Sequence, residues 1–233
     1  MASRHALLCL PPHFAETAYT LDTRLRRALN KVRGGRFDSY QITSGRYTGH
    51  FPLTPGAPAD DSRLVRPASG PADVCAGGPL SLLDLAVLRD RRATEAADLH
   101  DTWVRATDGM PPAQPWATFA EHWGANSFQA LLAFREQPQL KALAGISGPG
   151  TRQRGEEAAL IRLDRSEFID RARRRAVPGN SLRELDGTWT TDPAWLNSDD
   201  FSETGSTAYF DHANAYIDAL PADYLVVGVD CRR

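Results

Sequence analysis

The chain ends in an unbroken apolar run, "YLVVGVD" at residues 224–230, and this run constrains the fold more than any other segment. A strand with one face in water alternates apolar and polar residues, whereas this run is apolar on both faces of an extended chain. The run therefore predicts a central strand of a β-sheet.

The opening of the chain has the pattern of a strand, a helix and a second strand. The apolar residues 5–10, "HALLCL", stop at two prolines, which cannot donate hydrogen bonds to a sheet. Apolar residues then recur every three or four positions over 15–32 and end before two glycines, as in an amphipathic helix. Residues 37–51 complete the unit as a second strand with its turn.

The last third of the chain repeats this pattern. Residues 159–163, "ALIRL", read as a short strand that leads into a helix. Asp164 and Glu167 have the spacing of a capping box at the start of that helix. The pair Asp186-Gly187 predicts a hairpin turn, and apolar spacing predicts a further helix over 208–220.

A proline- and glycine-rich stretch separates these two parts. Residues 52–79 show no apolar period and read as a loop or linker. Helical patterns follow over 85–103, 116–123 and 126–143, with many aromatic residues in the last two.

Together these patterns predict an α+β protein with a ferredoxin-like antiparallel sheet, helices on one face of it and a helical insertion. We expect residues 1–51 and 157–233 to form the α+β core domain. Residues 52–79 would be the linker and residues 80–145 the helical insertion.

The amino-acid composition and the net charge narrow the class of protein. Apolar residues at 42% and charged residues at 24% are typical of a folded globular chain. A net charge of −2 gives no overall attraction to nucleic acid or to an anionic membrane. The amino-terminal apolar run is too short for an export signal or a membrane span, so we expect a cytoplasmic protein without a membrane partner.

No familiar cofactor motif is present. The three cysteines lie far apart and lack the spacing of a zinc site, and no glycine-rich nucleotide loop or nucleophile elbow occurs. We therefore expect neither a metal nor a cofactor. Cys231 follows the last strand, and a spectator thiol is the better interpretation there.

The strongest concentration of reactive groups is "FDSYQITSGRYTGHF" at residues 37–51. Alternation places Asp38 and Tyr40 on one face of a strand. A turn at Gly45 could bring Arg46, Tyr47 and His50 back to that face. Arg46 would bind an anion, His50 or Asp38 would move a proton, and Tyr40 and Tyr47 would form walls. The competing interpretation is a surface ion pair with two packed tyrosines.

Asp230 extends this hypothesis to the end of the chain. It follows the last strand, and it would approach Arg46 and His50 if that strand runs beside residues 37–42. A carboxylate there could act as a base and complete a cleft. The alternative is that Asp230 pairs with a nearby arginine.

Several segments also resemble a known group of proteins. These are the stretch at 37–51, "GGPLSLLDL" at 77–85, "RRAVPG" at 174–179 with "ELDGTW" at 184–189, and the ending "LVVGVDCRR". They resemble a family of actinobacterial and actinophage proteins in which the first motif has an aromatic-Asp-x-aromatic run before Gly-Arg-aromatic. Tyr47 replaces that family's usual tryptophan, and Arg232 replaces its usual histidine. The resemblance implies an actinobacterial cytoplasm and carries no activity with it.

Three classes of function fit these observations. The first is a cofactor-independent enzyme that acts on a small, anionic molecule in a cleft between the sheet and the helical insertion. The second is a nucleic-acid-binding protein that uses basic helices at 20–36 and 165–176. The third is a protein-interaction module whose tryptophan- and phenylalanine-rich insertion supplies the contact surface.

Overall fold

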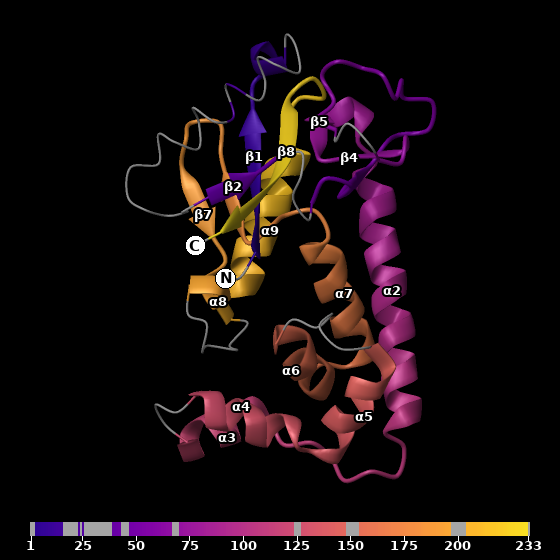
Figure 1. Ribbon diagram of the computed structural model, residues 1–233, viewed down its shortest axis with the longest axis vertical. Coiled ribbons are helices and arrows are strands. Elements are labelled where there is room, and N and C mark those ends of the chain that lie inside the picture. The colour runs from indigo at the N-terminus through magenta and orange to yellow at the C-terminus, as the bar shows by residue number, and fades with distance from the viewer. Residues whose placement is uncertain are drawn as a thin grey trace. The chain divides into compact units, whose positions relative to one another are not determined.

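The structure is a computed structural model that describes residues 3–15, 23, 25, 39–42, 47–66, 70–123, 127–147, 154–196 and 204–232 (Figure 1). The chain divides into two compact units. The first comprises residues 1–89, 174–196 and 204–233, and the second comprises residues 90–173 with 197–203.

The first unit is built on one mixed sheet, to which the described residues contribute six strands. They are β1 Ser3–Leu10, β2 Ser39–Gln41, β5 Gly77–Pro79, β6 Ser181–Arg183, β7 Trp189–Thr191 and β8 Leu225–Arg232. Their order is β2-β8-β1-β6-β7, with β5 paired to β8. A second, two-stranded sheet joins β3 Phe51–Pro52 to β4 Val74–Cys75.

The predicted central position of the last strand is confirmed. β8 runs antiparallel to β1 along the whole length of both strands, from Ser3 opposite Arg232 to Leu10 opposite Leu225. The other edge of β8 is shared by β5 and β2. The two ends of the chain therefore lie side by side in one sheet (Figure 1).

The prediction of a wholly antiparallel sheet is wrong at one pair of strands. β1 and β6 run parallel, with Ala6 opposite Ser181 and Leu8 opposite Arg183. Parallel neighbours need a long crossover connection, and the many helical residues between β1 and β6 supply one. The fold is thus α+β with a mixed sheet, and a ferredoxin-like topology is not confirmed.

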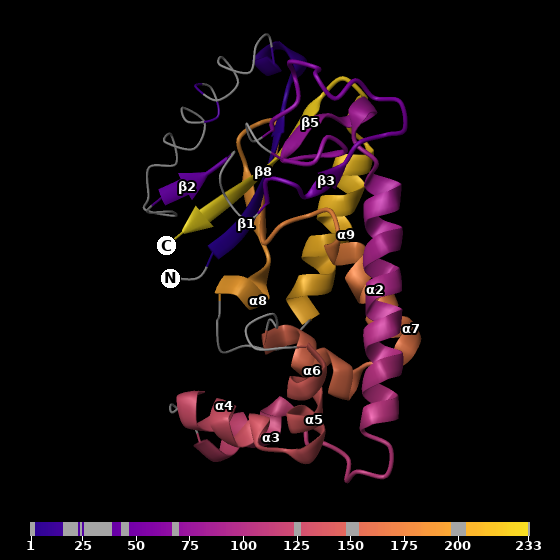
Figure 2. The ribbon, with the colours of Figure 1, turned by 45° about the vertical axis from the view of Figure 1, so that its right-hand side comes forward.

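Both faces of the sheet are covered. On one face, Leu7 and Val226 join a buried cluster with Phe210 and Ile217 of helix α9, Thr204–Asp218. Figure 2 shows α9 beside the sheet. On the other face, the alternate residues of β1 and β8 form a second cluster that includes Leu25. The expectation of helices on one face is wrong, because Leu25 is itself helical and because both faces of β8 are apolar.

The stretch at 52–79 is not a linker, because it carries one of the two residues of β3 and all of β4 and β5 within the first unit. Its glycines allow close packing between strands. A side chain at Gly77 would place its Cβ 2.2 Å from the carbonyl oxygen of Val226 on β8. Val65 and Cys75 are buried nearby. At Gly77, glycine reflects contact with a neighbouring backbone instead of chain flexibility.

The second unit is helical. It contains most of α2 Leu85–Ala106, together with α3 Trp116–Trp123, α4 Ser127–Arg135, α5 Pro138–Ser147, α6 Arg154–Arg162 and nearly all of α7 Arg165–Arg175. Its core includes Phe134, Leu143, Leu160 and Phe168. Of the described helices, none is long and apolar enough to cross a membrane.

Some of the predicted helices are confirmed and others are not. Those over 85–103 and 116–123 are confirmed, whereas the one over 126–143 is interrupted because Pro138 begins a new helix. Residues 159–163 belong mainly to α6 and are not a strand. An apolar run of five residues fits either structure, and two glutamates in the first turn of α6 favour the helix.

Two local signals are confirmed in detail. The Asp164 carboxylate accepts a hydrogen bond from the Glu167 amide, and the Glu167 carboxylate accepts one from the Asp164 amide. Gly187 has φ 94° in the turn between β6 and β7. Most of the helix predicted over 15–32 lies outside the described residues. Ala15 ends a 3-10 turn, and Thr23 and Leu25 are both helical.

The remaining elements connect the sheet. Two single turns of 3-10 helix, η1 Pro12–Ala15 and η2 Leu80–Leu82, follow β1 and β5. Helix α8 Pro193–Leu196 follows β7, and α9 leads back to β8. The predicted helix over 208–220 is confirmed as α9, with Ala213 and Ile217 inward.

The packing of α9 gives a test of the first unit. Ile217 is fully buried, so Ile217→Ala should lower the free energy of unfolding by about 2–5 kcal/mol, through lost burial and a cavity. Val87→Ala is the control, because Val87 is half exposed, and it should change stability by less than about 0.5 kcal/mol. Urea unfolding followed by circular dichroism measures both, and equal effects would contradict this packing.

Candidate functional site

The structure describes four of the six predicted site residues. Asp38 and Arg46 lie outside the described residues. Tyr40 lies in β2, Tyr47 and His50 flank a turn just before β3, and Asp230 lies in β8. The last strand does run beside residues 39–41, as the hypothesis about Asp230 requires.

Tyr47 and His50 meet a residue that the sequence analysis did not single out, His5 of β1. The His5 imidazole stacks on the Tyr47 ring, with centroids 4.0 Å apart and planes 14° from parallel. The His50 ring meets His5 edge-on at 4.5 Å. We call His5, Tyr47 and His50 the histidine cluster. A histidine at the head of the apolar run "HALLCL" was the only sequence signal for His5.

A short turn brings Tyr47 and His50 to β1. The His50 amide donates a hydrogen bond to the Tyr47 carbonyl at 3.2 Å and closes the turn. Phe51 follows at once, is fully buried, and pairs with Cys75 in the small β3-β4 sheet. Its ring also contacts the edge of His50 at 4.7 Å. The buried phenylalanine therefore anchors the turn beside His5.

Asp230 lies directly opposite His5 in the antiparallel pair of β1 and β8. Residues opposite each other in such a pair have their side chains on the same face, so the Asp230 carboxylate and the imidazole share one face of the sheet. Asp230 is 2% exposed. Its partner on β2 is Gln41, whereas Tyr40 is opposite Cys231. The register thus brings Gln41 to Asp230 in place of Tyr40.

His5 is held as a neutral imidazole. Burial lowers its pKa well below 6.5, and the charge of His50 lowers it further. Within the described residues, the Nε2 atom of His5 is buried without a hydrogen-bond partner. A protonated imidazole has two N–H donors, so protonation of His5 would leave a buried donor unsatisfied.

A buried polar network fixes the backbone on the far side of His5. The His5 carbonyl accepts a hydrogen bond from the Asn180 amide at 2.6 Å, and the Asn180 carbonyl accepts one from the Asp192 amide at 2.9 Å. The Asp192 carboxylate in turn accepts a hydrogen bond from Ser206 at 2.5 Å and pairs with Arg175 at 3.2 Å. This network holds the main chain at His5, and no local sequence pattern indicates it.

This arrangement suits proton transfer. It combines a neutral histidine, a second histidine 4.5 Å away, a phenol and a buried carboxylate.

In the part of the chain that the structure describes, no three histidine, cysteine or acidic side chains are grouped so as to hold a metal ion.

The cysteines are poor nucleophiles in this setting. Burial raises the pKa of Cys9 to about 12 and that of Cys75 to about 11, so both stay protonated at neutral pH. Cys231 is fully buried in the cluster on the opposite face of the sheet from Asp230.

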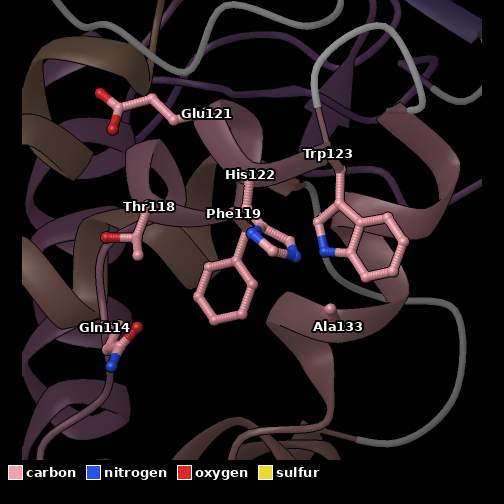
Figure 3. Close-up of a pocket in the computed structure, with 7 residues that line it drawn as sticks. All are labelled: Gln114, Thr118, Phe119, Glu121, His122, Trp123 and Ala133. Atoms are coloured by element: carbon pink, nitrogen blue, oxygen red, sulfur yellow. The ribbon is translucent and has the colours of Figure 1, made fainter.

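A pocket of about 600 Å³ lies in the second unit, between α3, α4 and the segment before α3. Figure 3 shows the rings of Phe119, His122 and Trp123 gathered along one wall, while the Glu121 carboxylate points away from them. Its polar groups do not converge, and none of the predicted site residues lines it. The histidine cluster is therefore the better candidate site.

The arginines of α7, on which the nucleic-acid hypothesis partly depends, are largely paired with acids. Arg165 donates to both carboxylate oxygens of Asp101, at 2.7 and 2.9 Å. Arg173, Arg174 and Arg175 form ion pairs with Asp90, Asp211 and Asp192. These carboxylates reduce the positive potential that phosphates would meet. The other helix of that hypothesis, 20–36, lies largely outside the described residues.

Comparison with known proteins gives no family or relative. No family model matches the chain, and neither a curated protein nor a solved structure matches it. The resemblance to actinobacterial and actinophage proteins therefore stays a prediction, and function has to be argued from the site itself.

The neutral state of His5 predicts how stability depends on pH. Unfolded His5 binds a proton near pH 6.5, whereas folded His5 does not, so the unfolded state binds more protons as the pH falls. The free energy of unfolding should therefore decrease from pH 6.5 towards pH 5.

The variant His5→Gln cannot titrate and should show a shallower decrease over the same range. Urea unfolding at several pH values measures both proteins. Parallel curves for wild type and variant would mean that His5 is protonated in the folded protein.

Proposed function

We propose that the protein is a cofactor-independent enzyme that acts on a small, anionic molecule by proton transfer at the histidine cluster. The observation that carries this proposal is the contact between buried, neutral His5 and His50. A buried titratable group whose pKa is strongly shifted, next to a second titratable group, is typical of acid–base sites. A purely structural core would be expected to fill this place with apolar rings instead of two imidazoles.

The proposal gives each group a role. His50 is half-buried with its Nε2 atom inaccessible, and it would exchange the proton with the substrate through its other ring nitrogen, Nδ1. Tyr47 stacks on His5 and forms a wall of the site. Asp230 shares the face of His5 and compensates positive charge there. Arg46 precedes Tyr47 in the chain and would bind the anionic group of the substrate.

Some earlier expectations remain part of the proposal. Asp38 as an alternative base, Tyr40 as a wall and a cleft bordered by the helical insertion stay predictions. So do a ferredoxin-like topology, an actinobacterial cytoplasm and the membership of an actinobacterial and actinophage family.

The first test is anion binding. Inorganic phosphate and small carboxylates should shift the NMR signals of His50, observed in protein with labelled histidines. Arg46→Ala should weaken this binding about tenfold or more while the thermal melt stays unchanged, since one charge-assisted contact is lost. Unfolding of the variant would instead assign Arg46 a structural role. No response of His50 to any anion at millimolar concentration would refute the anionic substrate class.

The second test is turnover. His50→Gln keeps a polar side chain of similar reach but cannot exchange a proton near neutral pH. It should lower kcat on a substrate found among small anionic molecules by about 10²–10⁴-fold, with little change in KM. Trp123→Leu in the second unit is the matched control and should leave kcat unchanged. Equal activity of wild type and His50→Gln would remove His50 from the chemistry.

A second candidate function, the protein-interaction module, is favoured by one observation. Phe128 and Leu132 lie one turn apart on α4 and are 64% and 46% exposed, and Trp123 of α3 is 39% exposed. Exposed apolar side chains that cluster in this way are typical of contact surfaces. Serine at both α4 positions would remove this surface without opening the core, and size-exclusion chromatography with cell lysate would show whether a complex is lost.

The nucleic-acid hypothesis is not favoured by the ion pairs of α7. Retention on heparin that falls steeply with salt would revive it.

A further inference from the structure

Gly228 occupies an unusual place for a glycine. It lies inside β8, which is paired along both edges, and its φ angle is not in the left-handed region. Glycine weakens the interior of a strand, because it loses more conformational freedom on folding and packs no side chain. The backbone conformation therefore does not explain why a glycine is present at this position.

The imidazole of His5 does explain it. A Cβ built on Gly228 would lie 2.7 Å from Nε2 of His5 and 3.6 Å from its Cδ2. In the β1-β8 register, Gly228 is two residues from Asp230, the direct partner of His5. The ring thus leans diagonally across the ladder and lies in the space that a side chain at 228 would fill.

The other sides of His5 are fixed independently. Its carbonyl oxygen would be 2.2 Å from a Cβ on Gly179, and it accepts a hydrogen bond from the Asn180 amide. The Tyr47 ring covers one face of the imidazole, and His50 meets it edge-on. The depth of the ring against β8 is then determined by residue 228.

We propose that Gly228 is a positioning residue, which lets the His5 imidazole lie against the backbone of β8 and beside His50. The inference rests on the proposed function of the histidine cluster. In this position Nε2 meets no acceptor among the described residues, so a second N–H on His5 would be buried unsatisfied. The groups that face His5 from its neighbours are Asp230, Tyr47 and His50.

The test is Gly228→Ala, because the added methyl group meets the end of a side chain and not a backbone atom at close range. At Gly228 the close contact is with the far end of the His5 ring, whereas alanine at Gly179 would collide with the His5 main chain. The matched control is Gly78→Ala on β5, whose Cβ would lie 2.8 Å from the Cδ2 atom of Leu64. The control introduces a similar clash in the same sheet without touching His5.

The readout is the titration of His5, followed by NMR with labelled histidine and assigned by the signal that disappears in His5→Gln. In wild type the His5 signal should stay in its neutral position down to about pH 5. In Gly228→Ala the midpoint should move up by about one pH unit or more, because the displaced ring gains access to water. In Gly78→Ala the signal should behave as in wild type. An unchanged titration in Gly228→Ala would overturn the inference.

A double-mutant cycle keeps the inference testable if Gly228→Ala folds poorly. Removal of the ring removes the clash, so His5→Ala combined with Gly228→Ala should melt at a higher temperature than Gly228→Ala. Recovery would support the contact between the ring and residue 228. A double variant that melts at or below Gly228→Ala would overturn it.

The dependence of kcat on pH, at its acid end, separates this inference from the proposed function. If both are correct, Gly228→Ala should lower kcat and shift that pH dependence by the same interval as the His5 titration. If the His5 signal shifts in Gly228→Ala but anion binding and turnover do not depend on His50, the positioning role is confirmed and the proposed enzyme is refuted.

Discussion

The rest of the first unit depends on the antiparallel pairing of β1 with β8. This ladder joins the first described residues of the chain to the last ones, and it has no interruption from Ser3 to Leu10. β8 also carries β2 and β5 on its other edge, so a single strand sets the register of three neighbours. Because alternate residues of β1 and β8 face different clusters, a shift of one residue would exchange the two cores and move His5 away from Asp230.

The same ladder explains how an ionisable ring can be buried at the sheet. A buried imidazole costs least as a neutral group, and the strand partners supply the space for one through the missing side chain of Gly228. The backbone beneath it is held by Asn180 and, through Asp192, by Arg175 and Ser206. This support network lies in elements far from His5 in sequence. The neutral state of His5 thus depends on β8, α7 and α9 and on the residues that flank β6 and β7.

Signals that depend on neighbouring residues in the chain could be predicted from the sequence. The capping box of Asp164 and Glu167, the turn at Gly187 and the inward face of α9 all follow from local spacing. Register and close approach could not be predicted in that way. Alternation could not show that Gln41 would be opposite Asp230, and glycine at 77 is equally typical of a linker and of a tight strand contact. The place of His5 in the site could not be predicted, because its partners Tyr47 and His50 lie more than forty residues away in the sequence.

The two halves of the histidine cluster are held with unequal strength, and this asymmetry bears on how the site would work. His5 belongs to a ladder that is paired over its whole length. His50 follows a turn closed by one backbone hydrogen bond, and it is anchored by Phe51 and a pair of two-residue strands. Local opening costs least where the fewest hydrogen bonds and buried contacts must break. Any adjustment to a bound anion should therefore occur at Tyr47 and His50, against a fixed and neutral His5. A proton acceptor on a short turn, next to an uncharged ring held by a continuous ladder, would mean that the site carries at most one histidine charge when it binds an anion.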